Sequence, residues 1–79
     1  MGLTVLYFAK ARQIMGSSRE AFDLYPSVQA LLDKVVQVHP SLASVISTCA
    51  VAVNERYADR SQPLRDGDVV AIIPPVSGG

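Results

Sequence analysis

The sequence predicts an α+β fold in which a mixed sheet of four or five strands carries one main helix on one face. Three observations predict it. The 79 residues, 49% of them apolar, suffice for one small core. One segment, 28–36, has apolar residues at helical spacing, and the remaining apolar runs are short and rich in β-branched side chains. We expect one domain over residues 1–73, followed by a flexible, extended C-terminal tail over residues 74–79.

The first third of the chain is expected to form a loose hairpin. Residues 3–8 (LTVLYF) are β-branched, aromatic or aliphatic, which favours a strand. Residues 9–18 contain helix formers up to a Gly-Ser-Ser break and predict a short helical turn or a long loop. Residues 19–25 (REAFDLY) then form the second strand.

The middle of the chain contains the clearest helix signal. Ser27 is a good N-cap, and His39-Pro40 should end the helix. Between them, apolar residues recur every three or four positions: Val28, Leu31, Leu32, Val35 and Val36. Residues 41–47 are expected to add a short helical turn.

The last third is expected to complete the sheet. Residues 49–54 (CAVAVN) predict a strand, and residues 55–58 (ERYA) predict a short strand paired with it. An Asp66-Gly67 turn then leads into the final strand over residues 68–73.

The first and last strands are apolar on both faces, although one helix can cover only one face of the sheet. Leu3, Val5 and Tyr7 alternate with Leu6 and Phe8 in the first strand. In the last strand, Val69, Ala71 and Ile73 alternate with Val70 and Ile72. We interpret the surplus as a partner-binding patch on the open face. The alternative is that these are interior strands whose excess apolar surface is partly exposed.

Composition argues against several classes of function. Seven basic and seven acidic residues give no net charge, so nucleic acid is not an expected partner. Apolar runs of five residues or fewer predict neither a signal peptide nor a membrane span. A single cysteine, Cys49, favours a reducing, cytoplasmic setting and a buried structural thiol. One cysteine and one histidine cannot form a Cys/His zinc site, and His39 is expected to cap its helix.

The last residues predict a reactive tail. Pro74 and Pro75 favour an extended exit from the sheet, and six residues can reach about 20 Å. Val76 and Ser77 offer one apolar and one polar contact, and Gly78 and Gly79 suit a narrow tunnel. The reacting group would be the Gly79 carboxylate, activated as a mixed anhydride with AMP. No phosphate-binding loop is present in the sequence, so ATP would be bound by a separate enzyme. A frayed end or a cloning remnant is the alternative.

Three stretches resemble one known family: VLYFAKARQIMG, AVAVNERYA and PLRDGDVVAIIPPVSGG. They resemble the small subunit of molybdopterin synthase, a ubiquitin-like β-grasp sulfur carrier. The resemblance spans essentially the whole chain, and its most specific part is DGD followed by an apolar strand and PPVSGG.

The resemblance implies a mechanism shared between proteins. An adenylyltransferase and sulfurtransferase similar to ubiquitin-activating enzymes would adenylate Gly79, which would then become a thiocarboxylate. The tail would insert into the large synthase subunit and donate sulfur to cyclic pyranopterin monophosphate, forming the dithiolene of molybdopterin. The implied assembly is a heterotetramer of two large and two small subunits. No cofactor or metal would be bound by this chain.

The resemblance also implies docking residues. Phe8, Tyr57 and Ile73 match positions that contact the partner, and Lys10 and Arg12 match a basic pair near the exit of the tail. An equally good alternative for Lys10 and Arg12 is that they lie on a face that contacts only solvent.

Other functions remain open on the sequence alone. The chain could carry sulfur for thiamine synthesis or transfer-RNA thiolation, or act as a ubiquitin-like protein modifier through Gly79. It could also be an interaction module with an inert tail.

Overall fold

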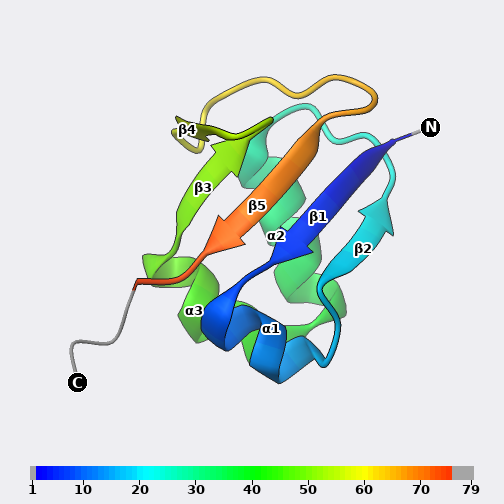
Figure 1. Cartoon of the computed structure of the whole chain (residues 1–79). Coiled ribbons are helices and arrows are strands. Elements are labelled where there is room, and N and C mark those ends of the chain that lie inside the picture. The colour runs from blue at the N-terminus through cyan, green and yellow to red at the C-terminus, as the bar shows by residue number, and fades with distance from the viewer. Residues whose placement is uncertain (1, 76–79) are drawn as a thin grey trace.

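The computed structural model describes residues 2–75 and shows a five-stranded mixed sheet with helices packed against one face and one end (Figure 1). Its strands are β1 (Leu3–Tyr7), β2 (Arg19–Phe22), β3 (Ala50–Val53), β4 (Arg56–Ala58) and β5 (Val69–Ile73). The strand order is β2-β1-β5-β3-β4. The central pair, β1 and β5, is parallel, and the other neighbours are antiparallel. The mixed sheet predicted from the sequence is therefore confirmed.

The helical segments are α1 (Ala9–Met15), α2 (Val28–Val38), the 3-10 helix η1 (Pro40–Leu42) and α3 (Ala43–Thr48). The main helix, α2, has the predicted caps. The Ser27 hydroxyl accepts a hydrogen bond from the Ala30 amide at 3.2 Å, and the His39 amide donates to the Val35 carbonyl at 2.8 Å. Within residues 2–75, no helix has the length and apolar character needed to cross a membrane.

All five strands are shorter than the sequence predicts, as the ends of the first two show. The first ends at Tyr7, because Ala9 has a φ of 49° and turns the chain directly into α1. Phe8 therefore precedes α1 as its N-cap residue, with extended backbone. The second strand ends at Phe22, so that residues 23–25 form the connection to α2.

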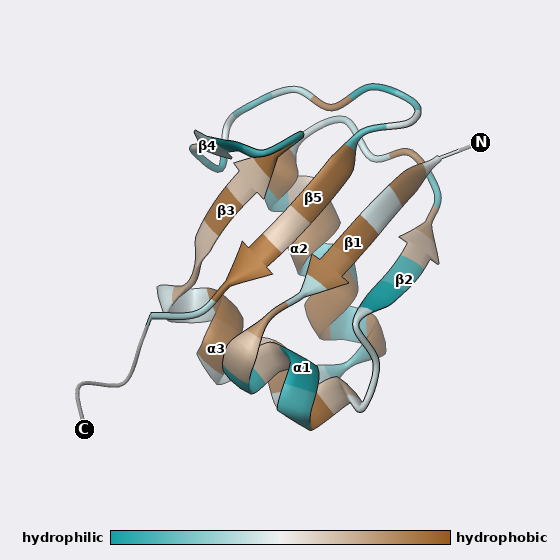
Figure 2. Ribbon diagram, viewed as in Figure 1, coloured by the Kyte–Doolittle hydropathy of each residue, from teal (hydrophilic) through white to brown (hydrophobic). Residues whose placement is uncertain are grey.

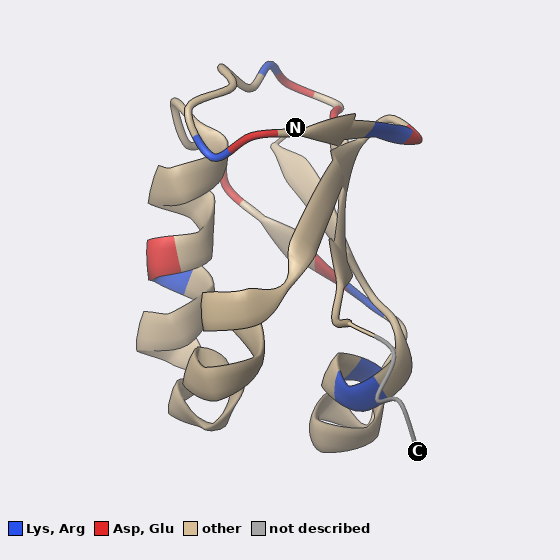
Figure 3. Cartoon of the chain, turned by 90° about the vertical axis from the view of Figure 1, so that its left-hand side faces the viewer, with Lys and Arg blue, Asp and Glu red and all other residues tan. Residues whose placement is uncertain are grey.

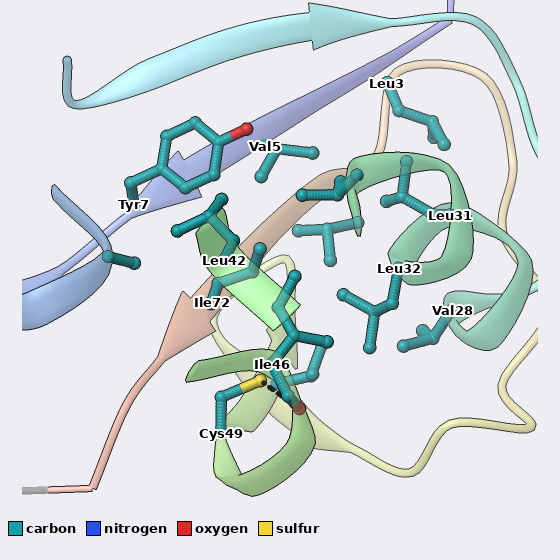
Figure 4. Close-up of a cluster of buried hydrophobic side chains, with 14 of the residues drawn as sticks. Leu3, Val5, Tyr7, Val28, Leu31, Leu32, Leu42, Ile46, Cys49 and Ile72 are labelled. Atoms are coloured by element: carbon teal, nitrogen blue, oxygen red, sulfur yellow. Dashed lines mark hydrogen bonds between the residues drawn. The ribbon is translucent and has the colours of Figure 1, made fainter. Parts of the chain in front are cut away.

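The core lies between α2 and the inner face of the sheet (Figure 4). Burial alternates along β1 and β5, as the two-residue period of a strand requires. Helix α2 contributes Val28, Leu31, Leu32 and Val35, each at most 1% exposed. These side chains pack with Leu3, Val5, Tyr7, Leu42, Val51, Val53, Val70 and Ile72. The helical spacing in the sequence therefore identified the buried face of α2.

A polar chain closes one end of the core. The buried Tyr7 hydroxyl donates to Glu20 Oε1 at 2.7 Å, and His39 Nε2 lies 2.8 Å from the same oxygen. Burial raises the pKa of Tyr7 well above its usual value, and the hydrogen bond to Glu20 raises it further. Because the three residues belong to β1, β2 and the end of α2, the contacts fix the sheet against its helix.

Cys49 is buried, as predicted, but it is the C-cap residue of α3 and precedes β3 instead of belonging to that strand (Figure 4). Its thiol lies 3.4 Å from the Ile46 carbonyl oxygen, and burial raises its pKa. The Arg60 guanidinium donates to the same carbonyl at 2.6 Å and to the Cys49 carbonyl at 3.3 Å. The nearby Arg60 guanidinium by itself lowers the pKa of Cys49, but burial has the larger effect, so the thiol form and a structural role are favoured.

We expect Gly2→Ala to lower the free energy of unfolding by about 2–3 kcal/mol. Gly2 has a φ of 107°, and an added Cβ would overlap the carbonyl oxygen of Phe22 in the neighbouring strand. Gly67→Ala is the matched control, because Gly67 has a φ of 88° but no atom near the position of a Cβ. It should cost only about 1 kcal/mol, from backbone strain alone. Equal costs in urea denaturation would contradict the close approach at Gly2.

Candidate functional site

The face of the sheet opposite α2 carries an exposed apolar surface, which we call the open face. Leu6 of β1 and Val69, Ala71 and Ile73 of β5 are half-buried there, although no helix covers them. Figure 2 shows that β1, β3 and β5 are hydrophobic along most of their length, whereas β2 and β4 are more hydrophilic. The surplus apolar residues of the central strands therefore lie together on one face.

The open face is hollowed. A depression of about 440 Å³ is lined by Leu6, Phe8, Ala52, Asn54, Glu55, Tyr57, Val69, Ala71 and Ile73. Tyr57 is 79% exposed and Phe8 46% exposed, which is high for aromatic side chains in a small domain. An apolar hollow with exposed aromatic residues is typical of a protein-binding surface.

The turn from β1 to α1 brings Phe8 to this hollow. The carbonyl of Phe8 accepts the amides of Ala11 and Arg12 at 3.0 and 3.3 Å, which ties Phe8 to the first turn of α1. Its side chain is thereby presented beside the sheet, and Lys10 follows two residues later on the helix. An alanine at positive φ carries no sequence signal for such a turn, so the local conformation could not be predicted.

The tight turn between β3 and β4 places Tyr57 at the hollow. Asn54 and Glu55 form this turn with φ values of 49° and 71°, and Tyr57 then pairs with Ala52 across the hairpin. The Asn54 amide group donates to Asp68 Oδ1 at 2.9 Å, and its oxygen accepts the Val69 amide at 2.9 Å. These two bonds hold the hairpin against the start of β5.

Asp68 is the other anchor of this hairpin. Hydrogen bonds from the Arg65 backbone amide, and secondarily from the Asn54 side chain, hold the pKa of Asp68 below its usual value. Asp68 is therefore ionised near neutral pH and strengthens both bonds.

The chain leaves the sheet from β5, the central strand, rather than from an outer strand. Pro74 is buried and Pro75 is exposed. Both line a second, smaller hollow of about 170 Å³, together with Lys10, Ser44, Val45 and Thr48. The exit therefore lies between α1 and α3, and Figure 3 shows the two basic residues of α1 at this end of the domain.

The structure brings most of the described docking candidates together. Phe8, Tyr57 and Ile73 line the open-face hollow, and Lys10 lines the hollow at the exit. Arg12 is exposed on α1 and lines neither hollow. Whether these residues contact a partner stays a prediction. The tail candidates Val76, Ser77, Gly78 and Gly79 lie outside the described residues.

Sequence reasoning missed three lining residues of the open-face hollow: Ala52, Asn54 and Glu55. Ala52 lies in a strand that is apolar throughout, so its face could not be chosen without the strand register. Asn54 is a residue type that accepts positive φ, which is a signal for a tight hairpin turn. Glu55 gives no such signal.

Comparisons with known proteins cover the whole chain. It matches the model of the ThiS family over residues 5–79. It is 43% identical to the molybdopterin synthase sulfur carrier subunit of Chlamydomonas reinhardtii over an alignment of 83 positions, which covers 100% of both chains.

Two solved structures share its fold. Small archaeal modifier protein 1 from Haloferax volcanii is 29% identical over 98% of each chain, with a TM-score of 0.86. The complex of subunits 1 and 2 of molybdopterin-converting factor from Helicobacter pylori contains a chain that is 28% identical over 100% of both chains, with a TM-score of 0.74. The similarity therefore includes the residues that line both hollows.

Proposed function

The chain belongs to the ThiS family, together with the molybdopterin synthase sulfur carrier subunits that it matches, and on this basis we propose that it is the sulfur carrier subunit of a molybdopterin synthase. Its ubiquitin-like β-grasp fold agrees with the fold predicted from the sequence. One observation supports the proposal most directly. Ile73 lines the open-face hollow and Pro74 lines the hollow at the exit, so the chain passes directly from the candidate docking face to the start of the C-terminal segment.

The first step is activation of the Gly79 carboxylate. A carboxylate oxygen attacks the α-phosphorus of ATP on a separate adenylyltransferase, and pyrophosphate leaves. The sequence of this chain contains no phosphate-binding loop of the Walker type, so the nucleotide is bound by that enzyme. A sulfur donor then displaces AMP, so that one carboxylate oxygen is replaced by sulfur and a thiocarboxylate results.

The second step is delivery of the sulfur. The open face docks on the large synthase subunit, and Pro74, Pro75, Val76, Ser77 and Gly78 carry the thiocarboxylate of Gly79 into that subunit. There the sulfur is transferred to cyclic pyranopterin monophosphate, and water restores the Gly79 carboxylate. Two such transfers, from two carrier chains or from one chain loaded twice, supply the two sulfur atoms of the dithiolene of molybdopterin. The assembly contains two large and two small subunits. This chain supplies the sulfur and no cofactor of its own.

Intact-mass spectrometry tests the proposal. The protein is incubated with an activating enzyme of the ubiquitin-activating type, ATP and a sulfur donor, and then with the large synthase subunit and cyclic pyranopterin monophosphate. We expect the mass to rise by the difference between sulfur and oxygen, and the gain to disappear as molybdopterin forms. A mass that never changes would show that the tail is not activated and would favour the inert interaction module. A thiocarboxylate that the pterin does not discharge would assign the chain to another sulfur pathway, such as thiamine synthesis or transfer-RNA thiolation.

The similarity to a small archaeal modifier protein favours a second candidate function, protein modification. In that case the activated Gly79 carboxyl would form an amide bond with a lysine amine of a target, releasing AMP. High-mass conjugates that disappear when Gly79 is deleted would identify this use. Their absence, together with sulfur transfer, would leave the carrier function alone.

A further inference from the structure

The open-face hollow has one charged lining residue among residues 2–75, and it lies at one end. The lining is apolar or aromatic except for Asn54 and Glu55 at the β3–β4 turn. Both polar groups of the Asn54 side chain are bonded within the domain, to Asp68 and to the Val69 amide. The Glu55 carboxylate makes no hydrogen bond or ion pair with any residue that the structure describes. It is therefore the group of this rim that is available to a partner.

Glu55 occupies a position that does not favour it. Its φ of 71° lies in the left-handed region, where a glycine at the second position of a two-residue hairpin turn would cost less. The neighbouring Arg56 makes no ion pair with Glu55 within residues 2–75, and it lines a polar hollow that also includes Asp59 and Asp68. A carboxylate is thus held at the rim of an apolar surface by a strained turn.

The opposite end of the open face has the opposite charge. Lys10 and Arg12 are exposed on α1, near the exit of the chain, and no acidic residue belongs to that helix. Figure 3 shows the basic residues of α1 at one end of the domain and, at the other end, the tip of the β3–β4 hairpin, which carries both acidic and basic residues. Among the residues that line the two hollows beside β5, the acidic one, Glu55, lies at the hairpin and the basic one, Lys10, lies at the exit.

We propose that Glu55 is a specificity-determining contact that pairs with a basic side chain of the large synthase subunit. The inference rests on the proposed function and names the chemistry of the partner at one end of the same surface. A neutral apolar surface closing over Glu55 would remove water from the carboxylate without replacing its hydrogen bonds, which is costly. A basic side chain of the partner at that point removes the desolvation cost of the carboxylate. The opposite charges at the two ends of the surface then admit only one orientation of the carrier, with its exit toward the acidic end of the partner.

Binding kinetics to the large synthase subunit test the proposal. Glu55→Lys should lower the association rate about tenfold at low salt, and the loss should shrink at about 0.5 M salt, because a rim charge acts through screened electrostatics. Glu55→Gln should give a smaller loss of the same kind. Asp33→Lys is the matched control, since it makes the same change in net charge at an exposed position of α2, which packs on the other face of the sheet. It should change the rate less than about twofold.

Two further readouts separate the possible failures. Phe8→Ala should weaken binding at every salt concentration, because it removes apolar contact rather than charge. Melting temperatures of the Glu55 variants should match that of the unmodified chain, so that a binding loss is not an unfolding effect. If Glu55→Lys and Asp33→Lys have equal effects while the unmodified chain binds, the role of Glu55 is wrong and the proposed function stands. If the unmodified chain does not bind the large subunit, the proposed function fails and this inference fails with it.

Discussion

Deletion of Gly79 abolishes sulfur transfer to the pterin precursor and leaves the melting temperature unchanged: this is the largest effect that we expect. Without Gly79, the terminal carboxylate belongs to Gly78 and lies up to about 3.5 Å short of its proper position. A misplacement of about 1 Å already costs on the order of a hundredfold in rate, so the loss should exceed that factor. One residue added after Gly79 should have the same effect, because the reacting carboxyl is then an internal amide.

The stability of the fold should not respond to these changes. The last described strand, β5, ends at Ile73, and the buried core cluster consists of residues between Leu3 and Ile72. A chain with one residue added before Met1 serves as the control for length and should retain full transfer. Transfer is measured by the loss of thiocarboxylate mass, and folding by thermal denaturation in the same buffer. Substantial transfer by the deletion variant, or a melting temperature lowered as much as by a core truncation, would contradict the prediction.

The second large effect is expected in the core. Leu32→Ala should lower the free energy of unfolding by about 2–5 kcal/mol, since Leu32 is 1% exposed and its truncation leaves a cavity between α2 and the sheet. In a domain of this size each kcal/mol lowers the melting temperature by roughly 4–8 °C. Val38→Ala is the matched control on the same helix, because Val38 is 45% exposed. It should change the stability by less than about 0.5 kcal/mol. Equal midpoints for the two variants in urea would show that the buried face of α2 had been assigned wrongly.

Most of the fold could be predicted because its signals are local. The apolar spacing from Val28 to Val36 and the Ser27 cap defined α2, and the Asp66-Gly67 turn marked the start of β5. Strand ends were less predictable. Phe8 continues the apolar run of β1, and only the left-handed backbone of Ala9 removes it from the strand. Alanine rarely adopts that conformation, so nothing in the sequence indicated it.

The candidate site could be predicted where it depends on alternation and could not where it depends on distant contacts. Apolar residues at both the odd and the even positions of β1 and β5 indicated an open apolar face before the strand register was known. The position of Glu55 depends instead on how the β3–β4 turn closes and on the bonds between Asn54 and Asp68, which are fourteen residues apart. The Tyr7–Glu20–His39 contacts likewise join three elements and leave no periodic trace in the sequence.

The central place of β5 in the sheet has a mechanical consequence. This strand is hydrogen-bonded to β1 on one side and to β3 on the other, and the segment that we propose enters the partner continues from its end. A force applied to that end along the strand shears the hydrogen bonds to β1 and to β3 at the same time. The bonds of one row therefore cannot break one after another before those of the other row. Had the tail continued from an outer strand, withdrawal from a tight tunnel could peel the strand away. With the segment continuing from β5, we expect the domain to stay folded when the proposed carrier is withdrawn from its partner.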